Sequence, residues 1–459
     1  MGKYKPPMMR DRPSPAAEAL SRAEELQQQA ERKRGETAIP SLQQAAVAYK
    51  EVLDLTKDGS LPEDRLANCH FGLGECMQQL GERILESCAA LPDAQLSADV
   101  EADARRNAAA VFRQAADAYQ KVTSPEDGRV RVDACVNRAN TLSAWAGAEA
   151  AWGRPSKGSD LLAAAVEGYR GALEQEEDAA TWSNLADTLV SQAELLEQQG
   201  VADARVPSLY SKAMAAYGKA CMLSSSEEGD DLPGLLNNWG VGLHSQGTHA
   251  KDHALALSSL EGAAQRLREA IAFSRGDPQP HNALGDTLMA RADLAGDPSE
   301  ALGFLNASLQ EGYSAALRLN SQDANAHVGS AEVHTALGKL ALVAGNTAAA
   351  AAHFLDALHF YQAALQKPEA LGILRDRSDV RYNYACVCAH AMASGAVQGD
   401  DVAAAQQECL STLSHLTAVG MTTPEQILKD PDFSQAKEQA WFSPVLGIST
   451  GHTQLPQQA

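Results

Sequence analysis

The sequence predicts an all-α protein, a solenoid of about eight helical hairpins. Alanine makes up nearly a fifth of the 459 residues and aromatic residues only 5%, a composition that favours helix throughout. The chain is longer than one hydrophobic core usually supports, so it consists either of several domains or of a stack of small units. Two patterns that recur along the chain favour the stack.

The first recurring pattern is an alanine, a tyrosine four residues later and a small residue three residues after that. Six of the ten tyrosines occupy its tyrosine position, and from Tyr119 onward the copies are 46 to 50 residues apart. The interval from Tyr49 to Tyr119 is longer, at 70 residues. The copies are Ala45, Tyr49, Val52; Ala115, Tyr119, Val122; Ala165, Tyr169, Ala172; Ala213, Tyr217, Ala220; Ala263, Leu267, Ala270; Leu309, Tyr313, Ala316; and Ala357, Tyr361, Ala364.

The second pattern precedes the first from the second unit onward, and its offsets of three, four and seven residues define one helical face. A glycine or alanine in the middle of this face lets the next helix approach, and the alanine and tyrosine of the first pattern are expected to pack there. Representative copies are His70, Leu73, Gly74, Met77; Trp182, Leu185, Ala186, Leu189; His281, Leu284, Gly285, Leu288; and His327, Ala331, His334.

Eight units follow in order along the chain, and a period near 48 residues implies helices of roughly 18 to 22 residues, about 30 Å long. The expected units are 16–57, 62–123, 129–175, 178–223, 231–275, 279–320, 323–368 and 377–446. The last includes a capping segment, 424–446, in which Phe433, Trp441 and Phe442 cover the final apolar face or dock a partner.

The two ends lie outside the repeats. Residues 1–15 form a basic, proline-rich arm that is expected to be extended, and residues 447–459 form a polar tail. The arm has no apolar core, so it is not a secretory signal. Its candidate contact residues are Lys3, Lys5, Arg10 and Arg12.

The hairpins resemble the tetratricopeptide repeat, whose first helix reads W-x2-L-G-x2-Y and whose second reads A-x3-F-x2-A. The resemblance covers residues 16–446, and its best copy runs from Trp182 to Leu189. The period departs from the family's usual length of about 34 residues. The resemblance implies a right-handed superhelix whose first helices line a concave groove for a partner protein or an extended peptide.

In this family, an asparagine two residues before the small residue of the first helix can form a ladder that binds a peptide backbone. An amide carries a donor and an acceptor together, so it matches a peptide unit without reading its side chain. Alternatively, these amides bond the neighbouring repeat. The matching residues are Asn137, Asn184, Asn238 and Asn383. Two units have Gly72 and Gly329 in this place, and a third has Ala283 beside a displaced Asn282.

The chaperone-tail clamp of the family needs a lysine directly before such an asparagine. The preceding residues here are Val136, Ser183, Asn237 and Tyr382. We therefore do not expect binding of Hsp90-type carboxylates.

Charge and cysteine content narrow the classes of partner and compartment. The formal net charge of -21 favours protein partners with basic or mixed-charge surfaces and argues against nucleic acid. No stretch is long and apolar enough to insert into a membrane. The eight cysteines show no disulfide framework, which favours a reducing compartment and a cytoplasmic location.

No motif for catalysis or for a cofactor stands out, so we expect no enzyme, no cofactor and no metal site. His244, His249 and His253 are the tight histidine group, and a solvated loop is favoured there over zinc. The acidic run that begins at Ser224, Ser225 and Ser226 is either a solvated loop or a phosphorylation site.

The sequence thus predicts a non-enzymatic scaffold or adaptor. A first alternative is a fixed structural component of a large assembly, such as a cytoskeletal or ciliary complex, held through the outer face and the arm. A second is the helical-repeat accessory subunit of an enzyme.

Overall fold

A computed structural model describes residues 14–33, 35–57, 62–89, 91, 98–122, 128–201, 204–224, 232–366, 374–418 and 420–446. Lys3, Lys5, Arg10, Arg12, Ser225, Ser226 and the tail 447–459 lie outside the described residues. The chain divides into two compact units. The N-terminal unit comprises Met1–Cys88 and Asp99–Leu223, and the C-terminal unit comprises Ala89–Ala98 and Ser224–Ala459.

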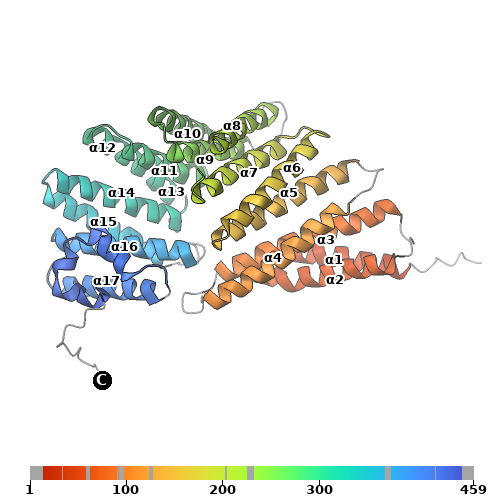
Figure 1. Cartoon of the computed structure of the whole chain (residues 1–459), viewed down its shortest axis with the longest axis horizontal. Coiled ribbons are helices and arrows are strands. Elements are labelled where there is room, and N and C mark those ends of the chain that lie inside the picture. Colours follow the sequence, from red (N-terminus) through yellow and green to blue (C-terminus); the bar gives the residue numbers. More distant parts are fainter. Residues whose placement is uncertain are drawn as a thin grey trace, which may run out of the picture. The chain divides into compact units, whose positions relative to one another are not determined.

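The N-terminal unit consists of helices that pair in chain order as hairpins (Figure 1). A 3-10 turn, Gly35–Ala38, connects the first two helices. The helices are α1 (Pro15–Glu31), α2 (Ile39–Leu55), α3 (Glu63–Ala89), α4 (Ala98–Gln120), α5 (Gly128–Ala151), α6 (Pro155–Leu173), α7 (Ala179–Gln198) and α8 (Arg205–Ser224).

The C-terminal unit continues the alternation of first and second helices, so the predicted all-α hairpin architecture is confirmed. A π-helical turn, Ser308–Tyr313, lies between α12 and α13, and 3-10 turns at Pro431–Phe433, Ala436–Glu438 and Ala440–Leu446 follow α18. The helices are α9 (Leu232–His249), α10 (His253–Phe273), α11 (Gln279–Asp293), α12 (Pro298–Ala307), α13 (Ser314–Leu319), α14 (Ala324–Val343), α15 (Thr347–Leu365), α16 (Leu374–Ala393), α17 (Asp400–Ala418) and α18 (Pro424–Lys429).

Local sequence signals set many of the helix ends. Asp178, Asp252 and Asp323 precede α7, α10 and α14, and each carboxylate accepts a hydrogen bond from a backbone N–H of the first turn. Gly200 and Gly345 follow α7 and α14 with φ of 75° and 72°, a conformation that glycine adopts without steric cost.

Helix length accounts for the long interval between Tyr49 and Tyr119. Helix α3 has 27 residues and α4 has 23, so the second hairpin is longer than its neighbours. The expected range of 18 to 22 residues is therefore too narrow, because α5 has 24 residues and α11 only 15. The nearly constant spacing of the pattern residues does not reveal these differences in helix length.

The pairing of small and large residues holds in the structure. The alanines of the first pattern that precede Tyr49, Tyr119, Tyr169, Tyr217 and Tyr361 have no exposed surface. A Cβ atom on Gly285 would lie 2.7 Å from the Tyr313 ring, and one on Gly329 of the next hairpin only 2.2 Å from it. A single tyrosine therefore occupies space opened by two glycines on successive first helices.

In the sixth hairpin, the small residue of the first pattern lies one position earlier than the sequence predicted. The sequence placed Leu309 at the alanine position, but the fully buried residue is Ser308, whose hydroxyl donates to the Gly285 carbonyl at 2.8 Å. The π turn adds one residue between this small residue and Tyr313, which shifts the spacing from four to five.

The segment after α17 covers the last hairpin. Phe433 and Phe442 are fully buried in one cluster with Tyr384 and Leu413, and Trp441 packs against that cluster. Asp432 pairs with Lys339 of α14 at 2.8 Å, which ties this segment to the preceding hairpin as well.

No described helix has the length and apolar character that crossing a membrane requires. The eight cysteines are free thiols. Burial raises the pKa of Cys69 to about 11 and that of Cys76 to about 12, so both stay protonated at neutral pH.

Candidate functional site

The candidate binding residues lie on the first helices of the hairpins, and we call the side of these helices that carries them the first-helix face. In the N-terminal unit it carries Asn137 on α5 and Asn184 on α7, and in the C-terminal unit it carries Asn238 on α9 and Asn383 on α16. All four predicted asparagines are partly buried.

In the N-terminal unit, the asparagines contact the tyrosine of the preceding hairpin or its polar partner. Asn184 donates from Nδ2 to Asn140 Oδ1 at 3.2 Å, and the Tyr169 hydroxyl donates to the same oxygen at 2.6 Å. The Tyr119 hydroxyl donates to Gln78 Oε1 at 3.4 Å, and the Asn137 side chain also bonds this hydroxyl. These amides therefore have hydrogen-bonding partners within the fold while their residues stay partly exposed.

In the C-terminal unit, Asn383 bridges two hairpins. It donates from Nδ2 to Glu332 Oε1 at 3.4 Å, and its side chain also bonds the Tyr361 hydroxyl. Asn238 accepts from Asn237 at 3.5 Å. Asn383 and Asn137 each bond a tyrosine hydroxyl. At the same position of the repeat, two other hairpins carry a glycine.

The two gaps in the asparagine ladder that hold glycine have a steric cause. A Cβ on Gly72 would lie 2.5 Å from Tyr49 Cζ, and one on Gly329 would lie 2.2 Å from Tyr313. The ladder position therefore faces the preceding tyrosine in these hairpins, and it holds glycine where the ring itself occupies the space.

The polar residue that directly follows the small residue of the first helix also belongs to this face, and the sequence prediction missed it. Tyr217 donates to the carboxylate of Asp187, and Tyr313 donates to that of Asp286. Burial raises the pKa of both tyrosines, so they remain protonated donors. The signal was available in the sequence, because this position holds Glu75, Asn140, Asp187, Asp286 and Glu332 in five hairpins.

The carboxylates of the first-helix face are poorly solvated. Burial raises the pKa of Glu332 to about 7, the charge of Asp286 adds to this effect, and the hydrogen bond from Asn383 opposes it. Neighbouring protein atoms displace water from the Asp286 carboxylate and raise its pKa, while the hydrogen bond from Tyr313 opposes this rise and the rest of the residue is exposed. Carboxylates that are surrounded by protein yet reachable are strong acceptors for lysine, arginine or backbone N–H groups.

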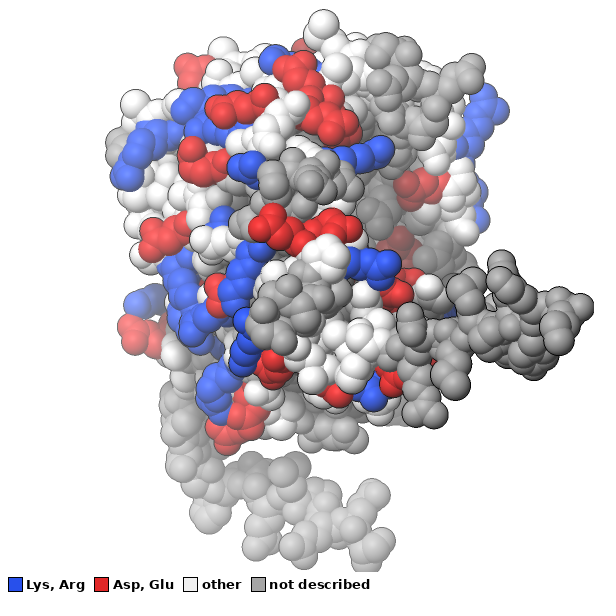
Figure 2. All heavy atoms as spheres, turned by 90° about the vertical axis from the view of Figure 1, so that its right-hand side faces the viewer, with Lys and Arg blue, Asp and Glu red and all other residues white. Residues whose placement is uncertain are grey.

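Charges of both signs occur over the surface. Figure 2 shows Lys and Arg interspersed with Asp and Glu on the face that it draws, so the net charge of -21 does not make this face uniformly acidic.

The three histidines do not form the expected solvated loop, because His244 and His249 lie in α9 and His253 begins α10, and they do not converge on one point. His249 Nδ1 bonds the Ser245 carbonyl at 2.9 Å, His244 Nδ1 bonds Thr287 at 3.3 Å, and His253 opens α10 in an exposed position. Among the described residues, the side chains that are close enough to hold one metal ion are His334, His353 and Asp356. Sequence spacing gave no indication of that group.

The solved structures that resemble this chain do so at low sequence identity. No protein-family model and no curated protein matches this chain. Among solved structures, the nuclear import adaptor Nro1 of S. pombe is 12% identical, with a TM-score of 0.40, over 67% of this chain and 98% of Nro1. YrrB, a TPR protein with an unusual peptide-binding site, is 18% identical, with a TM-score of 0.31, over 55% of this chain and 97% of YrrB.

The structural neighbours are tetratricopeptide-repeat and TPR-like proteins. They also include an IFIT1 variant solved with a capped RNA, which is 11% identical with a TM-score of 0.35 over 89% of this chain and 86% of IFIT1. These TM-scores lie below 0.5, so the description of the fold rests on the hairpins described above.

Proposed function

We propose that the protein is a non-enzymatic scaffold or adaptor that binds an extended segment of a partner protein on its first-helix face. The supporting observation is the recurrence, hairpin after hairpin, of partly exposed amides and carboxylates at two fixed positions of the first helix. The amides are Asn137, Asn184, Asn238 and Asn383, and the carboxylates include Asp187, Asp286 and Glu332.

This arrangement suits an extended basic segment. Amides offer a donor and an acceptor to a peptide backbone, and carboxylates accept hydrogen bonds from lysine and arginine. The net charge of -21 would steer basic or mixed-charge partners toward the protein and raise association rates. We propose a protein partner in the cytoplasm and neither nucleic acid nor an Hsp90-type carboxylate tail.

The asparagine substitutions Asn184→Ala and Asn238→Ala test the ligand role of the ladder. Partners captured from native extract by the wild-type chain are quantified against the double variant, and Gln265→Ala serves as a control because Gln265 is exposed on the second helix α10. A ligand role predicts lost capture with an unchanged melting temperature. A lower melting temperature with unchanged capture contradicts it.

A chain that begins after Ser14 separates this proposal from a fixed structural role in a cytoskeletal or ciliary assembly. Partners that are lost with the arm, and not with the asparagine substitutions, would favour contacts through Lys3, Lys5, Arg10 and Arg12. Co-purification of a catalytic chain would favour the accessory-subunit alternative.

A further inference from the structure

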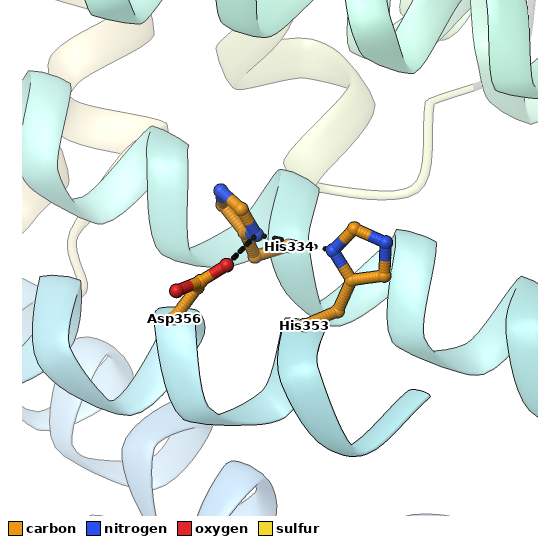
Figure 3. A group of neighbouring side chains, drawn as sticks. All are labelled: His334, His353 and Asp356. Carbon is orange, nitrogen blue, oxygen red and sulfur yellow. Dashed lines mark hydrogen bonds and ion pairs between the residues drawn. The ribbon is translucent and has the colours of Figure 1, made fainter. Parts of the chain in front are cut away.

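Three side chains of the seventh hairpin converge between its two helices. His334 extends from α14, while His353 and Asp356 extend from α15, one turn apart on the same side of that helix (Figure 3). His334 Nδ1 lies 3.3 Å from His353 Nδ1 and 3.4 Å from Asp356 Oδ2. All three ligand atoms lie within 4.8 Å of one another.

A single hydrogen bond cannot serve both contacts of His334 Nδ1. A neutral imidazole carries one N–H, so the Nδ1 hydrogen of His334 serves either His353 or Asp356 but not both. In either arrangement one of the two contacts of His334 Nδ1 has no hydrogen to share, and a cation between the three ligand atoms would serve all of them.

The repeat register shows how these histidines differ from the other hairpins. His334 occupies the last position of the second pattern, where the other hairpins have Met77, Leu142, Leu189, Leu243, Leu288 and Cys388. His353 stands four residues before the patterned alanine, where other hairpins have Val111, Leu161 and Leu209 or the serines Ser41 and Ser259. Two imidazoles thus meet where no other hairpin has a histidine at either position.

The ring of His334 is held in place from its other side. Phe360, one turn beyond Asp356 on α15, packs against it with ring centroids 5.5 Å apart and an angle of 30° between the rings. The side chain of His334 is 14% exposed and that of Asp356 is 52% exposed, so solvent reaches the cluster from the Asp356 side. The cluster is therefore oriented by packing and open to an ion from solution.

We propose that His334, His353 and Asp356 form a zinc site. Zinc prefers imidazole nitrogen and carboxylate oxygen at about 2.0–2.2 Å in tetrahedral geometry, which places neighbouring ligand atoms about 3.3–3.5 Å apart. The two distances from His334 Nδ1, 3.3 and 3.4 Å, match this spacing. Three protein ligands leave the fourth position to water or to a side chain of a partner, and the ion ties α14 to α15.

Zinc alone, added to the full-length chain after chelator treatment, tests the proposal by calorimetry. We expect one zinc ion per chain, and affinity that falls at least about tenfold in His353→Gln and in Asp356→Asn. His359→Gln is the matched control, because His359 is exposed on the same helix and lies outside the cluster. Circular dichroism verifies that each variant is folded.

Cobalt in place of zinc gives a spectroscopic readout of the ligands. We expect visible absorption bands of tetrahedral cobalt in the wild-type chain and in His359→Gln, and their loss in His353→Gln. The proposal is overturned if zinc does not bind stoichiometrically, if His359→Gln weakens binding as much as His353→Gln does, or if His249→Gln abolishes it instead.

Discussion

The fourth hairpin, α7 with α8, and the seventh, α14 with α15, follow the same register with different chemistry. Both bury a tyrosine against a small residue of the first helix, Tyr217 in one and Tyr361 in the other. At the ladder position the fourth hairpin has Asn184 and the seventh has Gly329. At the position after the small residue, the carboxylates Asp187 and Glu332 correspond.

The two hairpins diverge most at the ends of the two patterns. Leu189 and Leu209 of the fourth hairpin correspond to His334 and His353 of the seventh. Alanine and tyrosine therefore maintain helix packing in both hairpins, while other positions of the repeat can carry polar groups in place of apolar ones. Four experiments test this difference between the two hairpins.

The largest effect is expected from Gly329→Ala. The new Cβ would lie 2.2 Å from the ring of Tyr313, which is held by its hydrogen bond to Asp286, so the ring or the helix must shift. We expect a loss of about 3 kcal/mol in the free energy of unfolding, measured by denaturant titration.

Gly218→Ala in the fourth hairpin is the matched control. A Cβ there meets nothing within 4 Å, and alanine favours helix, so we expect stabilisation by up to about 1 kcal/mol. Equal losses at both glycines would show that close approach is not what distinguishes them.

Removal of the tyrosine hydroxyls is expected to have the next largest effect on the free energy of unfolding. Tyr217 donates to the carboxylate of Asp187, whereas the hydroxyl of Tyr361 bonds the neutral amide of Asn383. Hydrogen bonds to charged groups contribute more, so we expect Tyr217→Phe to cost about 2 kcal/mol and Tyr361→Phe about 1 kcal/mol. Thermal unfolding of both variants checks the order, and the reverse order would contradict the assigned partners.

The raised pKa of Glu332 in the seventh hairpin predicts that the stability of the protein depends on pH. Its folded-state pKa of about 7 lies above the ordinary value near 4.5, so the folded state binds the proton more tightly than the unfolded chain does. The resulting stability is fully present below pH 4.5 and is lost as the pH rises through 7. Partial exposure limits the loss to about 1 kcal/mol.

Glu332→Gln removes the titrating group and keeps an acceptor for Asn383. We expect the variant to be more stable than the wild type at pH 8 and about equally stable at pH 4.5, as measured by urea unfolding at both values. A wild-type carboxyl that titrates near 4.5 by NMR would refute the assigned environment of Glu332.

The sequence predicted the hairpin architecture well, because each repeated contact joins residues at fixed spacings on consecutive helices. Ala213 and Tyr217 lie one turn apart on one helix, and the small residue that they meet is on the helix just before, so periodicity alone identifies them. The register failed at Ser308, because a single residue added by a π turn leaves the pattern nearly intact while moving the buried position.

The candidate site was less predictable, for a different physical reason. Asp187 and Asp286 were visible as polar residues after a small one, but their tyrosine partners became evident only with both helices in place. His334 and His353 lie 19 residues apart on two helices, so their approach depends on the hairpin and not on spacing. The detectable signal was histidine at two positions where several other hairpins, the fourth among them, carry leucine.

One measurement decides whether the same repeat frame can carry either an apolar contact or a metal site. His334→Leu with His353→Leu gives the seventh hairpin the residues of the fourth, and melting temperatures are compared with and without zinc. Zinc at about 100 times its Kd would stabilise the wild type by about 2.7 kcal/mol, which is several degrees. We predict that rise in the wild type, none in the variant, and a zinc-free variant at least as stable as the wild type. An equal response to zinc in both proteins, or none in the wild type, would contradict the account.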